Sequence, residues 1–149
     1  LVFVTAWRPC RGRRRAAPAH QALASRIDDA PVGVPEVEER LAVAVEAGIP
    51  EEHVCLDPGI GFGKTVEHNL ELLARLDELM ALGRPVLLGA SRKRFLGRLL
   101  GDPDAVTGPV AAGVAVAVLA FERGASFFRV HDVRPHVEAL AAAGAVVAR

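Results

Sequence analysis

Several residue types are scarce in this sequence, and their scarcity excludes whole classes of protein. Tyrosine is absent, cysteine occurs twice, and 18 basic side chains are balanced by 18 acidic ones. Two cysteines are too few for a disulfide framework, which favours a reducing compartment and a cytoplasmic protein. A chain without net charge has no general attraction to nucleic acid or anionic membranes. No apolar run approaches the roughly 20 residues that a membrane span needs.

Apolar residues, in contrast, are plentiful. They make up 51% of the 149 residues, which supplies the core of one domain and excludes a disordered chain. The sequence begins with Leu1, so we expect residues to be missing upstream. Its first apolar stretch lacks the basic region that precedes the core of a signal peptide, so we expect no such leader.

The first 35 residues differ in composition from the rest. They are rich in arginine, alanine and proline. Residues 1–5 are typical of a short buried strand, whereas residues 7–35 show neither a strand nor a helix period and are interpreted as an irregular segment. The basic run 11–15 is a candidate nucleic-acid contact, but it lacks interleaved aromatic residues, so a solvated segment is the simpler interpretation. We therefore divide the chain into residues 1–35 and a regular domain over residues 36–149.

From residue 36 onward, helical and strand patterns alternate. Apolar residues at helical spacing predict a helix around Val37–Val45, ended by Gly48. Three strands are predicted, each followed by a loop and at least one helix: residues 53–56, 85–88 and 126–130.

Two residues are predicted to cap helices. Thr65 suits the N-cap of the helix after the first of these strands, and Asp132 suits the N-cap of the last helix. The apolar stripe of the helix after Thr65 places Asn69 on its polar face.

This alternation predicts a parallel sheet, open or closed into a barrel, with the strand at residues 1–5 as a further member. Ligands bind at the carboxyl ends of the strands in both forms. A polar cluster follows each of the three later strands: Asp57, then Ser91-Arg92-Lys93, then Arg129 and His131. Parallel strands would bring the three clusters to one rim, so the pattern alone predicts a site.

The first cluster lies in a glycine-rich run that begins at Asp57. A phosphate-binding P-loop needs glycine where this run has Pro58, so a nucleotide triphosphatase is not predicted. The Asp57 carboxylate can pair with a ligand that presents an N–H and an amino group side by side. The alternative is that Asp57 only caps the turn before Pro58.

The other two clusters are basic. The Lys93 ammonium would lie over the same rim, although a solvated helix start is the alternative for Ser91-Arg92-Lys93. Arg129 and His131 alternate on one face of their strand beside a helix start, which suits an anion such as phosphate or pyrophosphate. A surface pair between arginine and aspartate, with a satisfied histidine, is the alternative there.

Together these motifs resemble those of the dihydropteroate synthase family. They read LDPGIGFGKT at 56–65, GASRKRFLG at 89–97 and RVHDV at 129–133, in the family's order and approximate spacing. The resemblance covers about residues 36–145, and its second motif is the most specific. The first motif alone also fits other pterin-binding barrels, such as methyltetrahydrofolate-dependent methyltransferase domains.

The resemblance implies a fold and a reaction. The family is a (β/α)₈ barrel that joins 6-hydroxymethyl-7,8-dihydropterin pyrophosphate to 4-aminobenzoate and releases pyrophosphate, with Mg²⁺. Asp57 would bind the amino group and ring N–H of the pterin, and Arg129 would stack on the pterin. With His131, Arg129 would also bind the departing pyrophosphate.

The remaining site residues are implied in the same way. Lys93 would hydrogen-bond the pterin ring and line the aminobenzoate pocket. Ser91 would lie by the aminobenzoate carboxylate, and Phe62 would pack at the pocket wall. Gly89 would let the backbone approach the ligand. Lys93, Arg129 and His131 are the expected catalytic residues.

The chain departs from the family pattern in three respects. A complete barrel takes about 250 residues, so the resemblance implies only its C-terminal half. The family's Mg²⁺ ligand would lie in the missing half, and we expect no metal site in this chain. Ala6 stands where the family's fifth strand carries a histidine. Residues 8–35 match nothing in the family pattern, and their composition suggests a hypothesis, an out-of-frame translation of GC-rich DNA.

These departures shape the functional expectation. The parent protein is expected to be a cytoplasmic transferase of folate synthesis, and a homodimer through its C-terminal helices, with no nucleic-acid or membrane partner. The isolated chain is expected to be inactive. Two alternatives stay open, a pterin-binding methyltransferase domain and a non-catalytic paralogue of the synthases.

Overall fold

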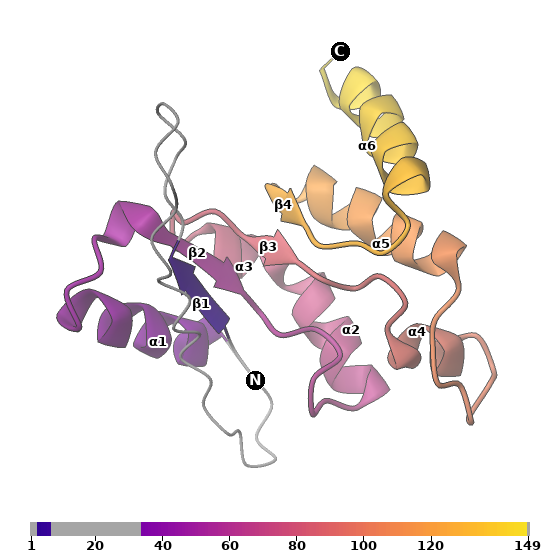
Figure 1. The fold of residues 1–149 in the computed structure, drawn as a ribbon, viewed down its shortest axis with the longest axis horizontal. Coiled ribbons are helices and arrows are strands. Elements are labelled where there is room, and N and C mark those ends of the chain that lie inside the picture. The colour runs from indigo at the N-terminus through magenta and orange to yellow at the C-terminus, as the bar shows by residue number, and fades with distance from the viewer. Residues whose placement is uncertain (1–2, 7–33, 149) are drawn as a thin grey trace.

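Short parallel strands form the centre of the fold in the computed structural model, which describes residues 3–6 and 34–148 (Figure 1). The later strands are β2 (Val54–Asp57), β3 (Leu87–Leu88) and β4 (Phe127–Phe128). Strands β3 and β4 pair in parallel, and a parallel bridge between Leu56 and Val86 joins β2 to β3. The predicted parallel arrangement of these three strands is therefore confirmed.

Along the chain, helices follow each of the strands β2, β3 and β4, as the alternating pattern predicts. In Figure 1, α1 lies at one end of the molecule and α5 and α6, which pack on each other, at the other. The bounds are α1 (Val34–Glu46), the 3₁₀ turn η1 (Glu51–His53), α2 (Val66–Ala74), α3 (Leu76–Met80), α4 (Arg94–Leu99), α5 (Val110–Glu122) and α6 (Val133–Val147). In the described residues the strands form an open arrangement and do not close into a barrel.

The first strand exists but its predicted direction is wrong. β1 (Phe3–Ala6) pairs with β2 in the antiparallel direction, with Phe3 opposite Asp57 and Ala6 opposite Val54. The backbone N–H and C=O groups along the free edge of β2 need partners, and a short strand can supply them in either direction. The sequence pattern of a strand carries no information about that direction.

Helix ends follow the expected residue chemistry at two of three positions. The Thr65 side chain accepts a hydrogen bond of 3.2 Å from the backbone N–H of His68, which confirms it as the N-cap of α2. Gly48 ends α1 with a φ of +87°, a conformation that other residues rarely adopt. Asp132 occupies the N-cap position of α6, but its side chain makes no capping bond. The predicted N-cap position is therefore confirmed, but this carboxylate binds Arg92 and caps no backbone N–H.

The start of α1 and the surroundings of Asn69 also differ from expectation. Helix α1 begins at Val34 and carries Pro35 in its first turn, where a missing N–H costs nothing, so the expectation of an irregular segment is wrong for residues 34 and 35. Asn69 is fully buried and does not lie on a polar face. Residues 7–33 of the expected irregular segment lie outside the described residues.

The core lies where the helices pack on the strands. Val54 and Leu56 of β2, with Val86 and Leu88 around β3, are at most 2% exposed. From the helices, the fully or nearly buried apolar residues are Val37, Leu72, Leu76, Leu79 and Leu96. Burial of such a side chain contributes about 1.5–3 kcal/mol, so this layer fixes the positions of the strand ends. Within the described part of the chain, no helix is long and apolar enough to cross a membrane.

Candidate functional site

The polar clusters that follow β2, β3 and β4 meet at one rim. Asp57 ends β2, and one of its carboxylate oxygens, Oδ2, lies 3.3 Å from Nη2 of Arg129, which follows β4. The backbone N–H of Arg129 donates to the carbonyl of Leu88 at 2.9 Å, which fixes the strand that carries the guanidinium. Lys93 acts electrostatically on both groups. The predicted convergence of residues 57, 93 and 129 is therefore what the structure has.

Asp57 is a buried carboxylate. Its side chain is 4% exposed, and its Oδ1 accepts a hydrogen bond of 2.9 Å from the backbone N–H of Gly59. Burial raises the pKa of this carboxyl above the ordinary value, and the Gly59 bond and the charges of Arg129, Lys93 and Lys64 oppose the rise. The turn-capping alternative describes the Gly59 bond, but it does not account for the three cations around one carboxylate.

Lys93 lies over an aromatic ring. Its ammonium nitrogen is 3.4 Å from the ring centroid of Phe62, a cation–π contact. Desolvation, and next the neighbouring Arg129 charge, lower the pKa of Lys93, whereas Asp57 raises it. Its aliphatic stem runs so close to Gly61 that a Cβ there would meet Lys93 Cδ at 2.6 Å. Lys93 and Phe62, which lie in different loops, thus form one wall.

Gly89 is needed for the placement of Arg129. A Cβ at this buried glycine would lie 2.9 Å from Nη2 of Arg129. The bare Cα therefore lets the guanidinium approach the strand end and reach Asp57. The close approach of a ligand to the backbone at Gly89, which the resemblance implies, stays a prediction.

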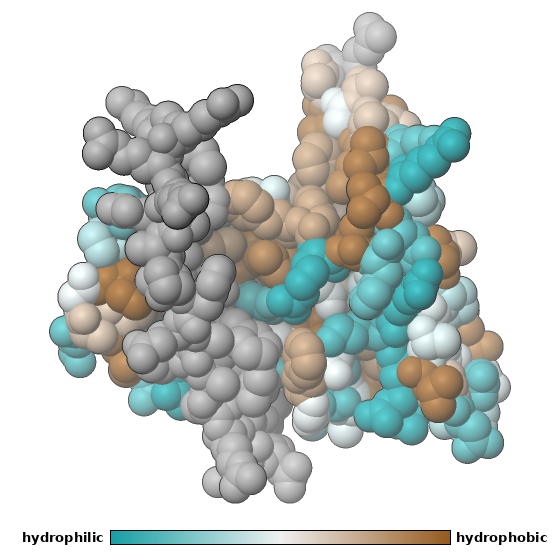
Figure 2. Space-filling view, viewed as in Figure 1, coloured by the Kyte–Doolittle hydropathy of each residue, from teal (hydrophilic) through white to brown (hydrophobic). Residues whose placement is uncertain are grey.

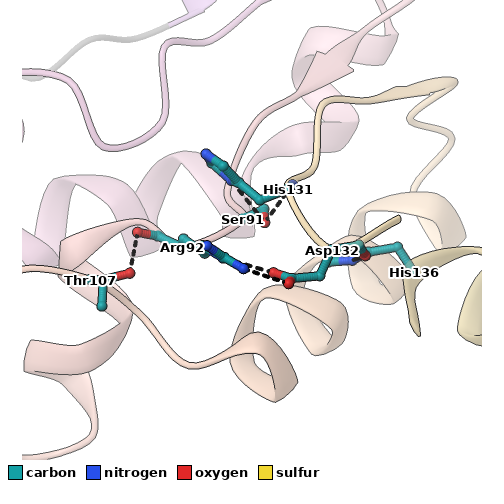
Figure 3. Close-up of polar contacts among 6 residues, drawn as sticks. All are labelled: Ser91, Arg92, Thr107, His131, Asp132 and His136. Carbon is teal, nitrogen blue, oxygen red and sulfur yellow. Dashed lines mark hydrogen bonds and ion pairs between the residues drawn. The ribbon is translucent and has the colours of Figure 1, made fainter. Parts of the chain in front are cut away.

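The loops after β3 and β4 are joined by side-chain contacts. Ser91 Oγ accepts a hydrogen bond of 3.2 Å from the backbone N–H of His131 and lies 3.3 Å from its Nδ1. The guanidinium of Arg92 holds both carboxylate oxygens of Asp132, at 2.7 and 2.9 Å. Figure 3 shows the two contacts side by side. An arginine–aspartate pair does exist here, as the alternative for the third cluster supposed, but it is formed by Arg92.

Asn69 is the functional candidate that the sequence interpretation missed. Its Oδ1 accepts a bond of 2.6 Å from the backbone N–H of Gly61, and its amide nitrogen donates to the carbonyls of Lys64 and Thr65. This one side chain therefore ties α2 to the glycine-rich loop that carries Phe62. An asparagine one turn after a helix N-cap, directly behind a run of glycines, was the available signal.

Lys64, the other lysine of the chain, serves the same loop. Its ammonium donates to the carbonyl of Gly59 at 3.0 Å and to that of Phe62 at 3.3 Å. Burial, the largest effect, lowers the pKa of Lys64. The loop is thus held from two sides, by an amide and by a cation.

The described residues offer little to a metal ion. They contain no group of three or more histidine, cysteine, aspartate or glutamate side chains that could hold one. The two oxygens of the Asp57 carboxylate contact the Gly59 N–H and Arg129.

Comparison with known proteins identifies the family to which these motifs belong. The family described as pterin-binding enzymes matches residues 23–131. The expectation that residues 8–35 match nothing in the family is therefore wrong from residue 23 onward. Dihydropteroate synthase of Mycobacterium leprae is 50% identical over 106 residues, covering 68% of this chain and 37% of that protein.

Solved structures agree with this match. Dihydropteroate synthase from Xanthomonas albilineans, in complex with 7,8-dihydropteroate, superposes with a TM-score of 0.71 at 44% identity and covers 78% of this chain and 45% of its own. The enzyme from Thermus thermophilus in complex with 4-aminobenzoate gives 0.69 at 48% identity, covering 76% and 45%. The chain thus corresponds to part of the synthase barrel and spans less than half the length of these proteins.

Proposed function

Because the chain belongs to the family of pterin-binding enzymes, we propose that it is the C-terminal half of a dihydropteroate synthase barrel. The parent protein would condense 6-hydroxymethyl-7,8-dihydropterin pyrophosphate with 4-aminobenzoate to give 7,8-dihydropteroate and pyrophosphate. The carrying observation is the buried Asp57 carboxylate beside Arg129, with Lys93 at the same rim. The cytoplasmic location expected from the cysteine content stays a prediction.

The pterin would bind at Asp57. A pterin edge presents a ring N–H and an amino group, two donors that an ionised carboxylate can accept together. Asp57 is supported for this task because the Gly59 N–H fixes its orientation, and because this bond and the surrounding cations oppose the rise in pKa that burial causes. Lys93 would donate to the ring from above, and Gly89 would leave room for the Arg129 guanidinium to stack on it.

The 4-aminobenzoate would bind beside Phe62 and Lys93. The exposed face of Phe62 supplies an apolar wall, and the ammonium above it is available to a nearby carboxylate. Ser91 stands at the same loop and would lie near the aminobenzoate carboxylate. The ring amine would then face the methylene carbon of the pterin.

The chemistry needs no protein nucleophile. Cleavage of the bond between the methylene carbon and pyrophosphate oxygen sends the electron pair to the anion and leaves a resonance-stabilised cation on the pterin. The arylamine nitrogen forms the new bond to carbon and then loses its proton. Arg129 and His131 would stabilise the charge on the departing pyrophosphate, and the rim would position the two rings.

Mg²⁺ is implied by the family alone. The described residues contain no acidic cluster that fits it, so no step here is assigned to the ion. Its expected ligand belongs to the part of the barrel that this chain lacks.

The expected homodimer has support in the exposed side chains of α6. Val133, Val137 and Val147, which fall on one face of α6 by helix periodicity, are each more than half exposed, and Figure 2 shows hydrophobic residues along this helix. A second copy that covers them would remove apolar surface from water. Light scattering of the full-length parent protein would report a mass of two chains.

Pterin binding by the purified 149-residue chain tests the proposal. We expect titration calorimetry with 6-hydroxymethylpterin to give saturable binding. Asp57→Asn should weaken it about 100-fold, because an amide replaces one of two acceptors with a donor and breaks charge-assisted hydrogen bonds. The matched control is Asp77→Asn, an exposed aspartate of α3 away from the rim.

Two results would contradict the proposal. One is equal pterin affinity for the Asp57 and Asp77 variants. The other is transfer of a methyl group from labelled methyltetrahydrofolate by the full-length parent protein, without incorporation of aminobenzoate.

A further inference from the structure

The turn Ser91–Arg92 contacts the loop after β4 through two neighbouring side chains. We propose that this turn positions His131, with Arg92 and Asp132 as the anchor and Ser91 as the residue that fixes the imidazole with its hydrogen on Nε2. The inference rests on the proposed function only in taking the anion at His131 to be a pyrophosphate.

The backbone of the turn is unusual at Arg92. This residue has a φ of 56°, the only positive φ outside glycine among the described residues. The backbone N–H of Lys93 closes the turn on the carbonyl of Ala90 at 3.2 Å. A bulky side chain in the left-handed region is strained, so the surrounding contacts must hold it there. Strain of this kind, beside a rim of charged residues, points to a positioning task.

Arg92 is held by contacts from two directions. Its guanidinium forms two hydrogen bonds with Asp132, 40 residues away along the chain. Its carbonyl accepts a bond of 3.2 Å from the Thr107 hydroxyl. Asp132 is fixed in turn, since its own carbonyl lies 2.7 Å from Nδ1 of the buried His136. The pair therefore joins two loops that are each anchored elsewhere (Figure 3).

The Ser91 hydroxyl determines what the imidazole can present. Ser91 is 4% exposed, and its Oγ accepts from the backbone N–H of His131, which can only donate. The Ser91 hydroxyl proton also needs an acceptor. Among the hydrogen bonds of the described residues, the only acceptor for it is Nδ1 of His131, at 3.3 Å. When Ser91 donates to Nδ1, the single hydrogen of a neutral imidazole stays on Nε2.

This arrangement suits an anion site. His131 is exposed, and its Nε2 lies at the end of the ring away from the Nδ1 that faces Ser91. A neutral His131 thus offers an N–H donor to a bound phosphate oxygen without having to be charged. The Ser91 hydroxyl proton then goes to His131, so Ser91 would lie near the aminobenzoate carboxylate without donating a hydrogen bond to it.

The ring nitrogens of His131 can be observed directly. In the full chain labelled with ¹⁵N-histidine, near pH 8, long-range proton–nitrogen spectra distinguish the two neutral tautomers, and His131→Gln assigns the signals. We expect the Nε2–H form in the parent chain. Ser91→Ala should give a mixture of both forms, whereas Ser91→Thr, which keeps the hydroxyl, should restore it.

Ser126→Ala is the matched control, because the Ser126 hydroxyl donates to the Gly124 carbonyl and does not contact the rim. It should leave the His131 signals unchanged. An Nδ1–H form in the parent chain, or the same tautomer with and without the Ser91 hydroxyl, would overturn the proposal.

Two substitutions at Arg92 test whether the turn acts on His131 through the ion pair with Asp132. Arg92→Gly removes the strain and the guanidinium together, whereas Arg92→Lys keeps a cation. If the turn acts through Asp132, Arg92→Gly broadens or shifts the His131 signals and Arg92→Lys shifts them less. Unchanged signals in Arg92→Gly would mean that the pair does not position His131, and that part of the proposal would fail.

Inorganic pyrophosphate separates this inference from the proposed function. We expect titration to move the His131 signals, with about 10-fold weaker binding in Ser91→Ala. If the tautomer responds to Ser91 but pyrophosphate leaves the parent signals unmoved, the positioning stands and the proposed anion site fails. If pyrophosphate binds equally well to both chains, the anion site stands and the positioning role of Ser91 fails.

Discussion

A buried carboxylate among cations governs the rim at the scale of single residues. Asp57 could be predicted because a lone aspartate at the end of a buried strand is unusual, and Arg129 and Lys93 because parallel strands end at one edge. The pair Arg92–Asp132 was not predicted, because Asp132 was interpreted as a helix cap and the sequence does not show which carboxylate the Arg92 guanidinium reaches. The buried amide of Asn69 was misplaced because helical spacing describes one helix and not the loop that lies over it.

The first prediction concerns pH. Burial raises the pKa of Asp57 above its ordinary value, so the carboxylate takes up its proton at a higher pH than an exposed aspartate would. A protonated carboxyl group carries an O–H donor in place of one acceptor oxygen, so it can no longer accept both N–H groups of a pterin. Pterin affinity should therefore be full above the raised pKa and fall as the pH drops through it.

The measurement is the dissociation constant of the pterin across the acid range. The residual affinity of Asp57→Asn should lack this dependence. An unchanged affinity of the parent chain down to the ordinary pKa of aspartate would contradict the prediction.

A pair of glycines separates loop strain from contact with the site. Gly61 and Gly63 both have a positive φ, but a Cβ at Gly61 would strike the Lys93 stem, whereas one at Gly63 meets nothing within 4 Å. Each substitution by alanine should destabilise the chain by about 1 kcal/mol through the left-handed backbone. Only Gly61→Ala should also weaken pterin binding, because it displaces Lys93.

Chemical denaturation and calorimetry on both variants measure the two effects. Equal losses of pterin affinity would show that the loop conformation matters and the contact with Lys93 does not.

At the scale of elements, the sequence was most informative about helix ends and least about strand direction. Thr65 and Gly48 have local chemistry that a sequence displays, an accepting side chain and a residue free to adopt a positive φ. The antiparallel pairing of β1 with β2 depends on which edge is free in space. That property belongs to the assembled sheet and leaves no trace in a four-residue pattern.

The joint between α2 and the glycine-rich loop provides the next prediction. Asn69→Leu keeps the approximate side-chain volume but leaves the Gly61 N–H without its acceptor. The free energy of unfolding should therefore fall by about 2 kcal/mol. Urea denaturation measures this. Asn69→Asp keeps an acceptor for Gly61 but turns a carboxylate toward the Thr65 carbonyl, so it should destabilise the chain as well.

The matched control is His68→Ala at the neighbouring position, because the His68 side chain takes no part in the Asn69 bonds to the loop. If His68→Ala lowers the free energy of unfolding as much as Asn69→Leu does, the Asn69 bonds between α2 and the loop do not stabilise the chain specifically.

At the scale of the whole molecule, an incomplete barrel limits what the chain can do. The matched synthases are more than twice as long as the part that the chain covers, and the strands of the described residues remain open. The motif order predicted this from the sequence, because three motifs of the later strands are present and the earlier ones are not. The family match contradicts the out-of-frame hypothesis from residue 23 onward, so the hypothesis stays a prediction only for residues 8–22.

We expect the purified chain to show no synthase turnover by itself. A half barrel has unpaired strand edges and lacks the other part of the rim. Incorporation of labelled 4-aminobenzoate into dihydropteroate measures this, with a full-length synthase as the positive control. Turnover by the 149-residue chain alone would contradict the prediction.

The buried Asp57 carboxylate faces the positive charges of Lys64, Lys93 and Arg129, so the open rim carries more positive than negative charge. An uncharged ligand does not neutralise this positive charge, whereas a polyanionic ligand does. Salt screens the attraction between the rim and a polyanion far more than it affects the binding of an uncharged ligand. Raising the ionic strength should therefore weaken the binding of a phosphorylated pterin and leave the binding of an uncharged pterin almost unchanged.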